Sequence, residues 1–412
     1  MVTRPVTVGA RRRLRNRRVL ISGAGIAGPT LAWWLLQHGF TPTVVEKAPA
    51  PRTGGYIMDF WGVGYDVAER MGLLPTLHQI GYRIEEVRAV NELGRRVAGF
   101  RADAFRAATN GRFLSIMRGD LASAIFSRIA GDVETIFGDS VTQLQEDDQG
   151  VTVSFEHHAQ RRFELVVGAG GLHSVVRSLA FGPESEFEKY LGYYTAAFSA
   201  SYPHRDEGVY VSYTVPGRQV TRYALRDGRS AFFMILAADR TLARTCYDVD
   251  AQRYVLRATF GGIGWEMGEI VAAMESADDL YFDAVAQARV PRWSRGRVVL
   301  LGDAAYCPSL LAGQGSALAM AGAYVLAQEL SAAGGDHRVA FDNYERRFKP
   351  FVDAKLRAAE RFGGWFAPRT TAGLRMRNLA MRAIGIPWIG KRILAGSFAD
   401  RFDLSRPSSR SA

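Results

Sequence analysis

The chain has 412 residues, of which 48% are hydrophobic and 23% charged, a composition typical of a soluble protein large enough for two packed domains. Its 52 Lys and Arg outnumber its 41 Asp and Glu, but no recognition motif accompanies the basic clusters, so we expect no nucleic-acid partner. No apolar run reaches the roughly 18 residues that span a bilayer. The separated Cys246 and Cys307 match no metal or disulfide pattern, and we expect a cytoplasmic protein without a metal site.

The first half of the chain alternates strands and helices. Residues 1–16 are basic and aperiodic, which predicts a disordered tail. An apolar strand at 18–22 then precedes a glycine-rich turn, a helix at about 29–39 and a strand at 43–46, which together form a βαβ unit. Further elements are predicted as strands at 84–90, 133–137, 151–155 and 165–167 and a helix at 118–129.

The middle of the chain changes character. Alternating strands, separated by turns such as Pro216-Gly217 and Asp227-Gly228, predict an antiparallel sheet from segments at 194–202, 208–215, 219–225 and 231–236. A buried strand at 298–301 and a helix at about 316–330 return to the first pattern, and the remainder to about residue 400 is helical. We therefore predict an α/β fold with a second, antiparallel-sheet domain.

The glycine-rich turn after the first strand has a recognisable pattern. Residues 23–28 (GAGIAG) fit G-x-G-x-x-G between a strand and a helix, and Glu46 ends the next strand about twenty residues later. Gly23 permits a tight turn, Gly25 lets the backbone approach phosphates, and Gly28 lets helix and strand pack closely. The helix N-terminus attracts a pyrophosphate, and Glu46 suits a ribose diol. NAD and FAD both use such a loop.

Two further glycine-containing segments follow. Residues 164–177 (ELVVGAGGLHSVVR) end a buried strand in a glycine turn, and residues 302–315 (GDAAYCPSLLAGQG) lead into a helix. The three motifs, in this order, resemble class A flavoprotein monooxygenases, the para-hydroxybenzoate hydroxylase superfamily, from about Val19 to Leu330. Within it the chain resembles most the branch of tetracycline-inactivating monooxygenases and polyketide hydroxylases, where Tyr306 is common.

The resemblance implies that the chain binds FAD. Asp303 is expected to hydrogen-bond the flavin ribityl chain, and the backbone at 313–316 to face the isoalloxazine and pyrophosphate. Arg118 is expected at the phosphate side, and Arg52 and Asp59 are expected to meet NADPH and flavin. The complete expected cofactor-binding set is Gly23, Ala24, Gly25, Ile26, Ala27, Gly28, Glu46, Lys47, Arg52, Asp59, Arg118, Val141, Asp303, Gly313, Gln314, Gly315 and Ser316.

The resemblance also implies how the chain is divided. The substrate pocket is expected between the antiparallel sheet and the flavin, with Arg222, Tyr223 and Phe233 as candidate lining residues. The expected parts are a discontinuous Rossmann-like FAD-binding domain (17–74, 112–181 and 290–345), an antiparallel-sheet substrate-binding domain (75–111 and 182–289), C-terminal helices (346–400) and a flexible tail (401–412).

The resemblance implies the reaction as well. NADPH or NADH reduces FAD, the reduced flavin forms a C4a-hydroperoxide with O2, and one oxygen atom passes to a bulky organic substrate, aromatic or polyketide-like. The cofactor carries this chemistry, so no nucleophile or acid–base residue is required and no catalytic residue is assigned. We expect a monomer or weak dimer whose partners are a small organic molecule and O2.

Two positions depart from the family pattern. Gly170 stands where the family usually has aspartate, so no nicotinamide role is carried over to that loop, and Leu310 stands where many relatives have proline. Both departures keep a non-catalytic flavin- or ligand-binding protein open as an alternative. A flavin dehydrogenase or reductase that does not activate O2 is the main alternative among enzymes. A plain NAD-dependent dehydrogenase is a third alternative, because NAD also uses the first glycine loop.

The segment from Leu374 to Leu394 alternates apolar and basic residues. Such a pattern is typical of a helix lying on a membrane surface, and also of a helix that closes the interface between two domains. Because Gly385 and Pro387 would interrupt a long surface helix, we prefer the second interpretation.

Overall fold

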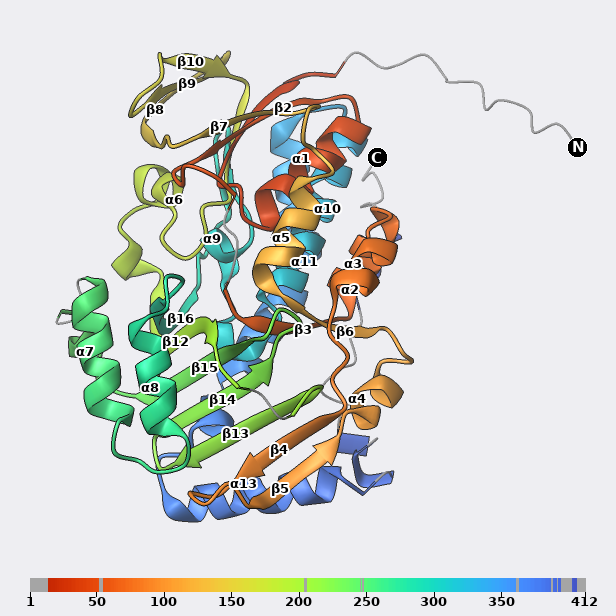
Figure 1. Cartoon of the computed structure of the whole chain (residues 1–412). Helices are drawn as coiled ribbons and strands as arrows, with labels where there is room; N and C mark the ends of the chain where they lie inside the picture. Colours follow the sequence, from red (N-terminus) through yellow and green to blue (C-terminus); the bar gives the residue numbers. More distant parts are fainter. Residues whose placement is uncertain are drawn as a thin grey trace, which may run out of the picture.

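The computed structural model describes residues 14–51, 55–203, 206–244, 246, 248–360, 363–386, 388–390, 392–393 and 402–405. Figure 1 shows a parallel sheet with helices stacked beside it and, below these, a long twisted sheet flanked by further helices. The predicted α/β fold with a second sheet is therefore confirmed. The predicted tail at 1–16 lies outside the described residues up to residue 13, and Arg52 lies outside them too.

The strand before the glycine loop, β1, lies inside a six-stranded sheet. Its residues Val19, Leu20 and Ile21 are fully buried, as expected for a parallel sheet covered on both faces. All neighbouring strands run parallel except β17, which is antiparallel to β18. In spatial order the strands are β17 (Ser294–Arg295), β18 (Val298–Leu300), β11 (Leu165–Gly168), β1 (Arg18–Ser22), β2 (Thr41–Glu46) and β7 (Glu134–Phe137).

Helices α1, α10 and α11 pack side by side along this sheet (Figure 1). The middle helix, α10, is rich in alanine and glycine, so its neighbours approach closely. At Gly322 the space is filled by buried Tyr306, whose hydroxyl hydrogen-bonds the Tyr344 hydroxyl at 2.9 Å. The helices of this region are α1 (Ala27–Gln37), α2 (Val63–Arg70), α3 (Leu74–Ile80), α5 (Arg118–Phe126), α6 (Val175–Ala180), α9 (Asp303–Tyr306), α10 (Gly315–Ala332) and α11 (His337–Glu360).

The second region is built on a seven-stranded sheet. Its strands pair antiparallel as predicted, except that β4, which comes from the earlier segment 84–101, pairs parallel with β13. One face is covered by α7 (Val249–Phe260) and α8 (Met267–Glu275). The spatial order is β16 (Tyr281–Ala288), β12 (Glu188–Ser201), β15 (Arg229–Ala237), β14 (Arg218–Ala224), β13 (Val209–Val215), β4 (Glu86–Val90) and β5 (Arg96–Arg101).

The C-terminal helix α13 (Thr371–Ile384) does not close a domain interface, and that prediction is wrong. Met381 and Ile384 pack on β4 and β5, and α13 contacts β13 as well, so the helix covers one end of the large sheet (Figure 1). The contact with the other region comes instead from the preceding short helix α12 (Gly363–Phe366), which touches the 3₁₀ turn η3 (Leu310–Ala312). An amphipathic pattern identifies a helix with one apolar face but does not say which surface that face meets.

Smaller elements complete the fold. The strands β3 and β6 form a two-stranded ribbon between the two regions, and β8, β9 and β10 form a hairpin-based sheet at the top of Figure 1. The predicted flexible tail does not hold for Phe402, which packs on Phe348 and Phe351. The remaining elements are β3 (Ile57–Trp61), β6 (Phe113–Met117), β8 (Val141–Asp147), β9 (Gly150–Phe155), β10 (Arg161–Phe163), α4 (Asp103–Ala108), η1 (Glu184–Glu186) and η2 (Arg240–Arg244).

The packing around α10 generates a stability prediction. A Cβ at Gly322 would lie 2.0 Å from the Tyr306 hydroxyl, so we expect Gly322→Ala to lower the free energy of unfolding by about 1–3 kcal/mol. The matched control is Gly268→Ala in α8, where a Cβ meets nothing within 4 Å and the better helix propensity should raise stability by about 0.5–1 kcal/mol. Urea denaturation of both variants measures the change in the free energy of unfolding. Equal changes in the two variants would contradict the packing argument.

Candidate functional site

The glycine loop lies at the carboxyl end of β1, where open α/β sheets bind ligands. Gly23 has φ +118°, and a Cβ there would lie 2.4 Å from the Ala169 carbonyl oxygen. A Cβ at Gly28 would lie 1.9 Å from the Gly23 oxygen, so both positions require glycine on steric grounds. A Cβ at Gly25 meets nothing within 4 Å. Gly25 therefore faces open space over the loop, which is where a bound phosphate would need room.

Glu46 ends β2 beside this loop. One carboxylate oxygen accepts a hydrogen bond from the Ala24 N–H at 2.8 Å, and the other accepts one from the Ala48 N–H at 3.0 Å. These bonds hold the carboxylate against the loop and leave further lone pairs for a ligand hydroxyl. Lys47 is exposed next to it, whereas Val141 is buried at the start of β8.

The third motif brings an acid and an open helix end together. Asp303 begins α9, and a Cβ at Gly315, the first residue of α10, would lie 3.5 Å from an Asp303 oxygen. The N-cap residue Gln314 makes no side-chain capping bond, so the first N–H groups of α10 remain available to a ligand. Burial raises the pKa of Asp303, and the nearby charge of Arg118 opposes that shift. Ser316 hydrogen-bonds the Met58 sulfur at 3.2 Å, which holds this helix end against β3.

Arg118 lies at the start of α5 and is half-buried. Its backbone N–H donates to the backbone carbonyl oxygen of Tyr56 at 3.0 Å. Its guanidinium has no ion-pair partner among the residues that the structure describes. A cation at a helix N-terminus is unfavourable unless an anion is present. FAD fits these features through its pyrophosphate and ribityl parts. They are the open space at Gly25, the uncapped starts of α1 and α10 and the Arg118 guanidinium.

Aromatic side chains line the space between this site and the large sheet. The Tyr56 ring lies 5.9 Å from Phe233 of β15 and 6.3 Å from Tyr281 of β16, measured between ring centroids. Burial raises the pKa of Tyr56 to about 12, which keeps its hydroxyl protonated at neutral pH. These three rings, called the aromatic wall below, form an apolar boundary suited to a flat organic molecule. Neither Tyr56 nor Tyr281 was predicted, because their elements meet only in the tertiary structure.

Asp59 of β3 meets the same face of the large sheet through Tyr210 of β13. Its Oδ1 accepts hydrogen bonds from the Ser115 hydroxyl at 2.5 Å and from the Tyr210 hydroxyl at 3.3 Å. Its Oδ2 has no hydrogen-bond donor within the described ranges. Burial raises the pKa of Asp59 to about 6, although the two hydrogen bonds lower it. A carboxylate held in this way can accept a hydrogen bond from a ligand at neutral pH.

The structure corrects one predicted substrate residue. Adjacent residues of a strand point to opposite faces, and Arg222 points away from the aromatic wall, toward α8. There it forms ion pairs with Asp206 at 3.1 Å and Glu266 at 3.2 Å. Its neighbour Tyr223 is on the wall's face but is buried, and its ring lies 5.1 Å from the Tyr210 ring. Of the three predicted residues, Phe233 alone belongs to the aromatic wall.

The second motif is anchored by His173. Its ring is 2.9 Å from Glu184 and 3.5 Å from Asp283 of β16, and hydrogen bonds to Asp283 and then Glu184 raise the pKa of His173 to about 10. Asp283 also accepts a hydrogen bond from the Tyr281 hydroxyl at 3.1 Å. The loop that has Gly170 instead of aspartate is thus tied to the large sheet by a protonated histidine, which no sequence motif indicated.

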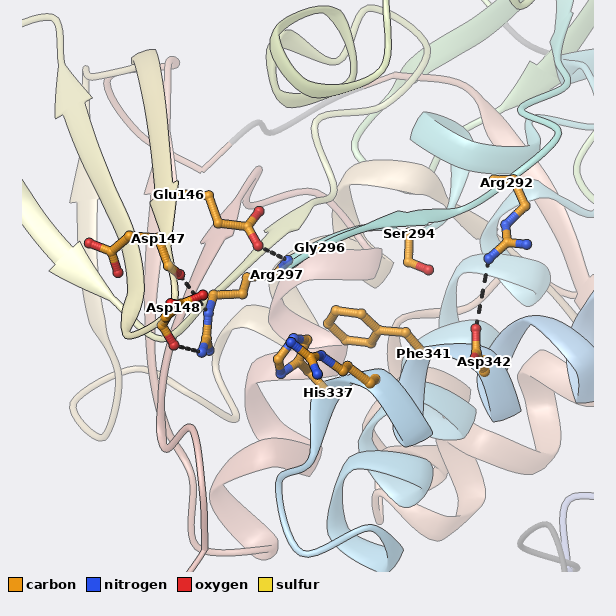
Figure 2. A pocket seen from close by; sticks show the side chains of 11 residues that line it. Glu146, Asp147, Asp148, Arg292, Ser294, Gly296, Arg297, His337, Phe341 and Asp342 are labelled. Carbon is orange, nitrogen blue, oxygen red and sulfur yellow. Dashed lines mark hydrogen bonds and ion pairs between the residues drawn. The ribbon is translucent and has the colours of Figure 1, made fainter. Parts of the chain in front are cut away.

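Figure 2 shows a surface cavity of about 670 Å³ that lies elsewhere, between the β8–β9 turn, β17 and the start of α11. Among its lining residues, Arg297 donates to the backbone oxygens of Asp147 and Asp148, and Arg292 lies 3.8 Å from Asp342. It lies at the amino end of β18, opposite the glycine loop, so it is not part of the site described above.

In the described part of the chain, no group of three or more His, Cys, Asp or Glu side chains could hold a metal ion. No described helix combines the length and the apolar character needed to cross a membrane. Cys246 and Cys307 form no disulfide.

Known proteins resemble the chain in sequence and structure. The FAD binding domain family matches residues 16–359. An uncharacterised protein of Mycobacterium tuberculosis is 39% identical over 345 residues, which cover 82% of this chain and 91% of that protein. A flavin-dependent monooxygenase from an unknown prokaryotic organism is 33% identical over 357 residues, covering 85% and 89%. The crystal structure of tetracycline destructase Tet(55) matches with a TM-score of 0.81 at 29% identity, over 95% of this chain and 99% of that one.

The open space at Gly25 generates a binding prediction. We expect Gly25→Val to leave the apoprotein as stable as the parent, because the new side chain meets no protein atom near its Cβ. The dissociation constant for FAD, measured by quenching of flavin fluorescence, should rise by about tenfold or more because the side chain fills the phosphate position. Gly262→Val, also with nothing within 4 Å of its Cβ, is the control. Unchanged FAD affinity of the Gly25 variant would show that this loop does not hold the cofactor.

Proposed function

From the premise that the chain belongs to the FAD binding domain family and is an FAD-dependent monooxygenase, we propose a specific reaction. The enzyme inserts one oxygen atom of O2 into a bulky aromatic or polyketide-like substrate, with NADPH or NADH as reductant. The overall balance is substrate-H, O2, NAD(P)H and a proton giving substrate-OH, NAD(P)⁺ and water. The dehydrogenase and the non-catalytic binding protein that the sequence left open are disfavoured by this family membership.

The observation that carries the proposal is the aromatic wall opposite Asp303 and Arg118. Three rings from β15, β16 and the segment before β3 enclose one side of the space, and Asp59 adds a single acceptor oxygen. A flat molecule with a phenol or enol hydroxyl matches such a surface, because its rings contact the wall and its hydroxyl donates to Asp59. A structural relative is named a tetracycline destructase, so tetracycline is the first probe.

The residues of this chain have distinct proposed tasks. FAD, when bound, supplies hydride acceptance and the activation of O2. The N-terminus of α10 would stabilise negative charge on the bound cofactor. Asp303 and Arg118 would fix the position of that cofactor. The aromatic wall excludes water from the reacting face. Asp59 withdraws the proton of a substrate hydroxyl, which makes an aromatic ring more electron-rich and thus easier to oxygenate.

Turnover tests the proposed reaction directly. With the FAD-loaded protein, adding a polycyclic phenol such as tetracycline should accelerate NADPH oxidation by about tenfold or more, because substrate binding closes a dry site. Mass spectrometry should find a product that carries one atom from isotopically labelled O2. Running the reaction without the phenol, with hydrogen peroxide measured, is the control. NADPH oxidation that yields only hydrogen peroxide across a panel of polycyclic phenols would assign the chain another substrate class.

The ionisation of Asp59 predicts a pH dependence. Because its pKa is about 6, kcat/KM for a phenolic substrate should fall as pH drops below about 6, where the protonated carboxyl loses its acceptor role. Asp59→Asn should lower kcat/KM by about 10²-fold at neutral pH and abolish that acid limb. The exposed Asp132→Asn variant, with the same chemical change, should keep both rate and profile.

Stability provides a second measurement for Asp59. Its pKa is higher in the folded state than in the unfolded state, so ionisation destabilises the fold as pH rises from about 4 through about 6. The thermal midpoint of apo Asp59→Asn should therefore exceed that of the parent by more at pH 7 than at pH 4. A difference that does not change with pH would contradict the raised pKa, independently of whether the enzyme turns over.

A further inference from the structure

The segment that carries α13 has an unusual charge pattern. Between Glu360 and Asp400 the sequence contains no Asp or Glu. The same stretch contains seven cationic residues, namely Arg361, Arg369, Arg375, Arg377, Arg382, Lys391 and Arg392. A solvated protein surface normally mixes both signs of charge, so this stretch forms a local positive field.

The outer surface of the same segment is apolar. Within α13, Met381 and Ile384 are buried against the large sheet, whereas Met376 is 73% and Leu379 is 66% exposed. Just beyond the helix, Trp388 is 72% exposed, with Ile386 and Ile393 also on the surface. Exposed large apolar residues are scattered singly on most proteins, so five within eighteen residues of one segment form a patch.

Cations flank these apolar residues along the helix. Arg375 and Arg382 lie four residues before and three residues after Leu379, so helical periodicity places them on the same outward side. Arg382 donates to the Val97 carbonyl oxygen at 2.7 Å, which holds the helix to β5. The helix is also fixed from within, because buried Arg377 donates to Thr214 and to Gln219, each at 3.0 Å. The patch is thus presented on a rigid base at the outer edge of the molecule (Figure 1).

We propose that this α13 patch, formed by Met376, Leu379, Ile386, Trp388 and Ile393 with Arg375 and Arg382, docks on an anionic lipid bilayer. Exposed Trp, Leu and Met partition into the interfacial layer, and Arg pairs with headgroup phosphates on either side of them. A second copy of the chain fits less well, because the exposed Arg375 and Arg382 of one patch would repel the same two residues of the other. Docking requires no change in the fold, because the inner face of α13 stays on the sheet.

Vesicle binding by the full-length FAD-loaded protein tests the proposal. The protein should co-sediment with phosphatidylcholine vesicles that contain phosphatidylglycerol and not with phosphatidylcholine alone. Binding should weaken at about 1 M NaCl, where the Debye length falls to about 3 Å. Equal binding to both vesicles, or to neither, would overturn the proposal.

Variants separate this patch from the overall positive charge of the chain. Met376→Gln with Leu379→Gln, and separately Arg375→Glu, should each reduce the partition coefficient by about tenfold while flavin content and thermal midpoint stay unchanged. Matched controls on α11 are Val339→Gln, at a residue 51% exposed, and Arg338→Glu, which should both bind as the parent does. An equal loss for Arg338→Glu would show binding through total charge alone and overturn the assignment. So would a vesicle-free dimer that the Met376/Leu379 variant abolishes.

Discussion

The site gathers positive charge that no side-chain cap or ion pair neutralises in the described part of the chain. The starts of α1 and α10 have no side-chain caps, and Arg118 has no ion-pair partner in the described part of the chain, yet all three border the same space. Such charge is unfavourable unless an anion occupies the site. The first glycine loop keeps that space open, since a Cβ at Gly23 or Gly28 would collide with backbone while Gly25 faces outward. The shape of the loop therefore keeps open the space that an anionic dinucleotide needs, and the positive charge around that space favours its binding.

The large sheet adds specificity by separating its two faces. One face packs on α7 and α8 and holds Arg222 in ion pairs, and the other carries Phe233 and Tyr281 toward Tyr56. Tyr56 and Asp59, from the chain in and before β3, contact this second face at Phe233, Tyr281 and Tyr210. His173 joins the two regions, because it contacts Asp283 on the strand that also carries Tyr281. This contact connects the second glycine loop to the strand that carries Tyr281.

The same sheet connects the site to the molecular surface through α13. The inner face of this helix is bonded to Thr214 and Gln219, on strands that border the proposed pocket, and its outer face is the apolar and cationic patch. An apolar polycyclic substrate concentrates in lipid, so a monooxygenase with this patch would work next to its substrate supply. The proposed bilayer contact and the proposed substrate class agree on these physical grounds while resting on different residues.

Local patterns in the sequence determined the parts of this protein whose geometry depends on neighbouring residues. The G-x-G-x-x-G turn, the strand–helix order and the alternating strands of the second sheet were all predictable, because turn sterics and period-two alternation act over a few residues. Asp303 was singled out by the resemblance of its motif to a known family and not by local geometry. The sequence alone could not show that β3 pairs with β6, that β4 joins β13 in parallel, that Arg222 points away from the site or that α13 covers the sheet. Those features depend on contacts between residues far apart in the sequence, from 16 positions for Arg222 and Asp206 to 163 positions for Arg377 and Thr214, which only the tertiary structure brings together.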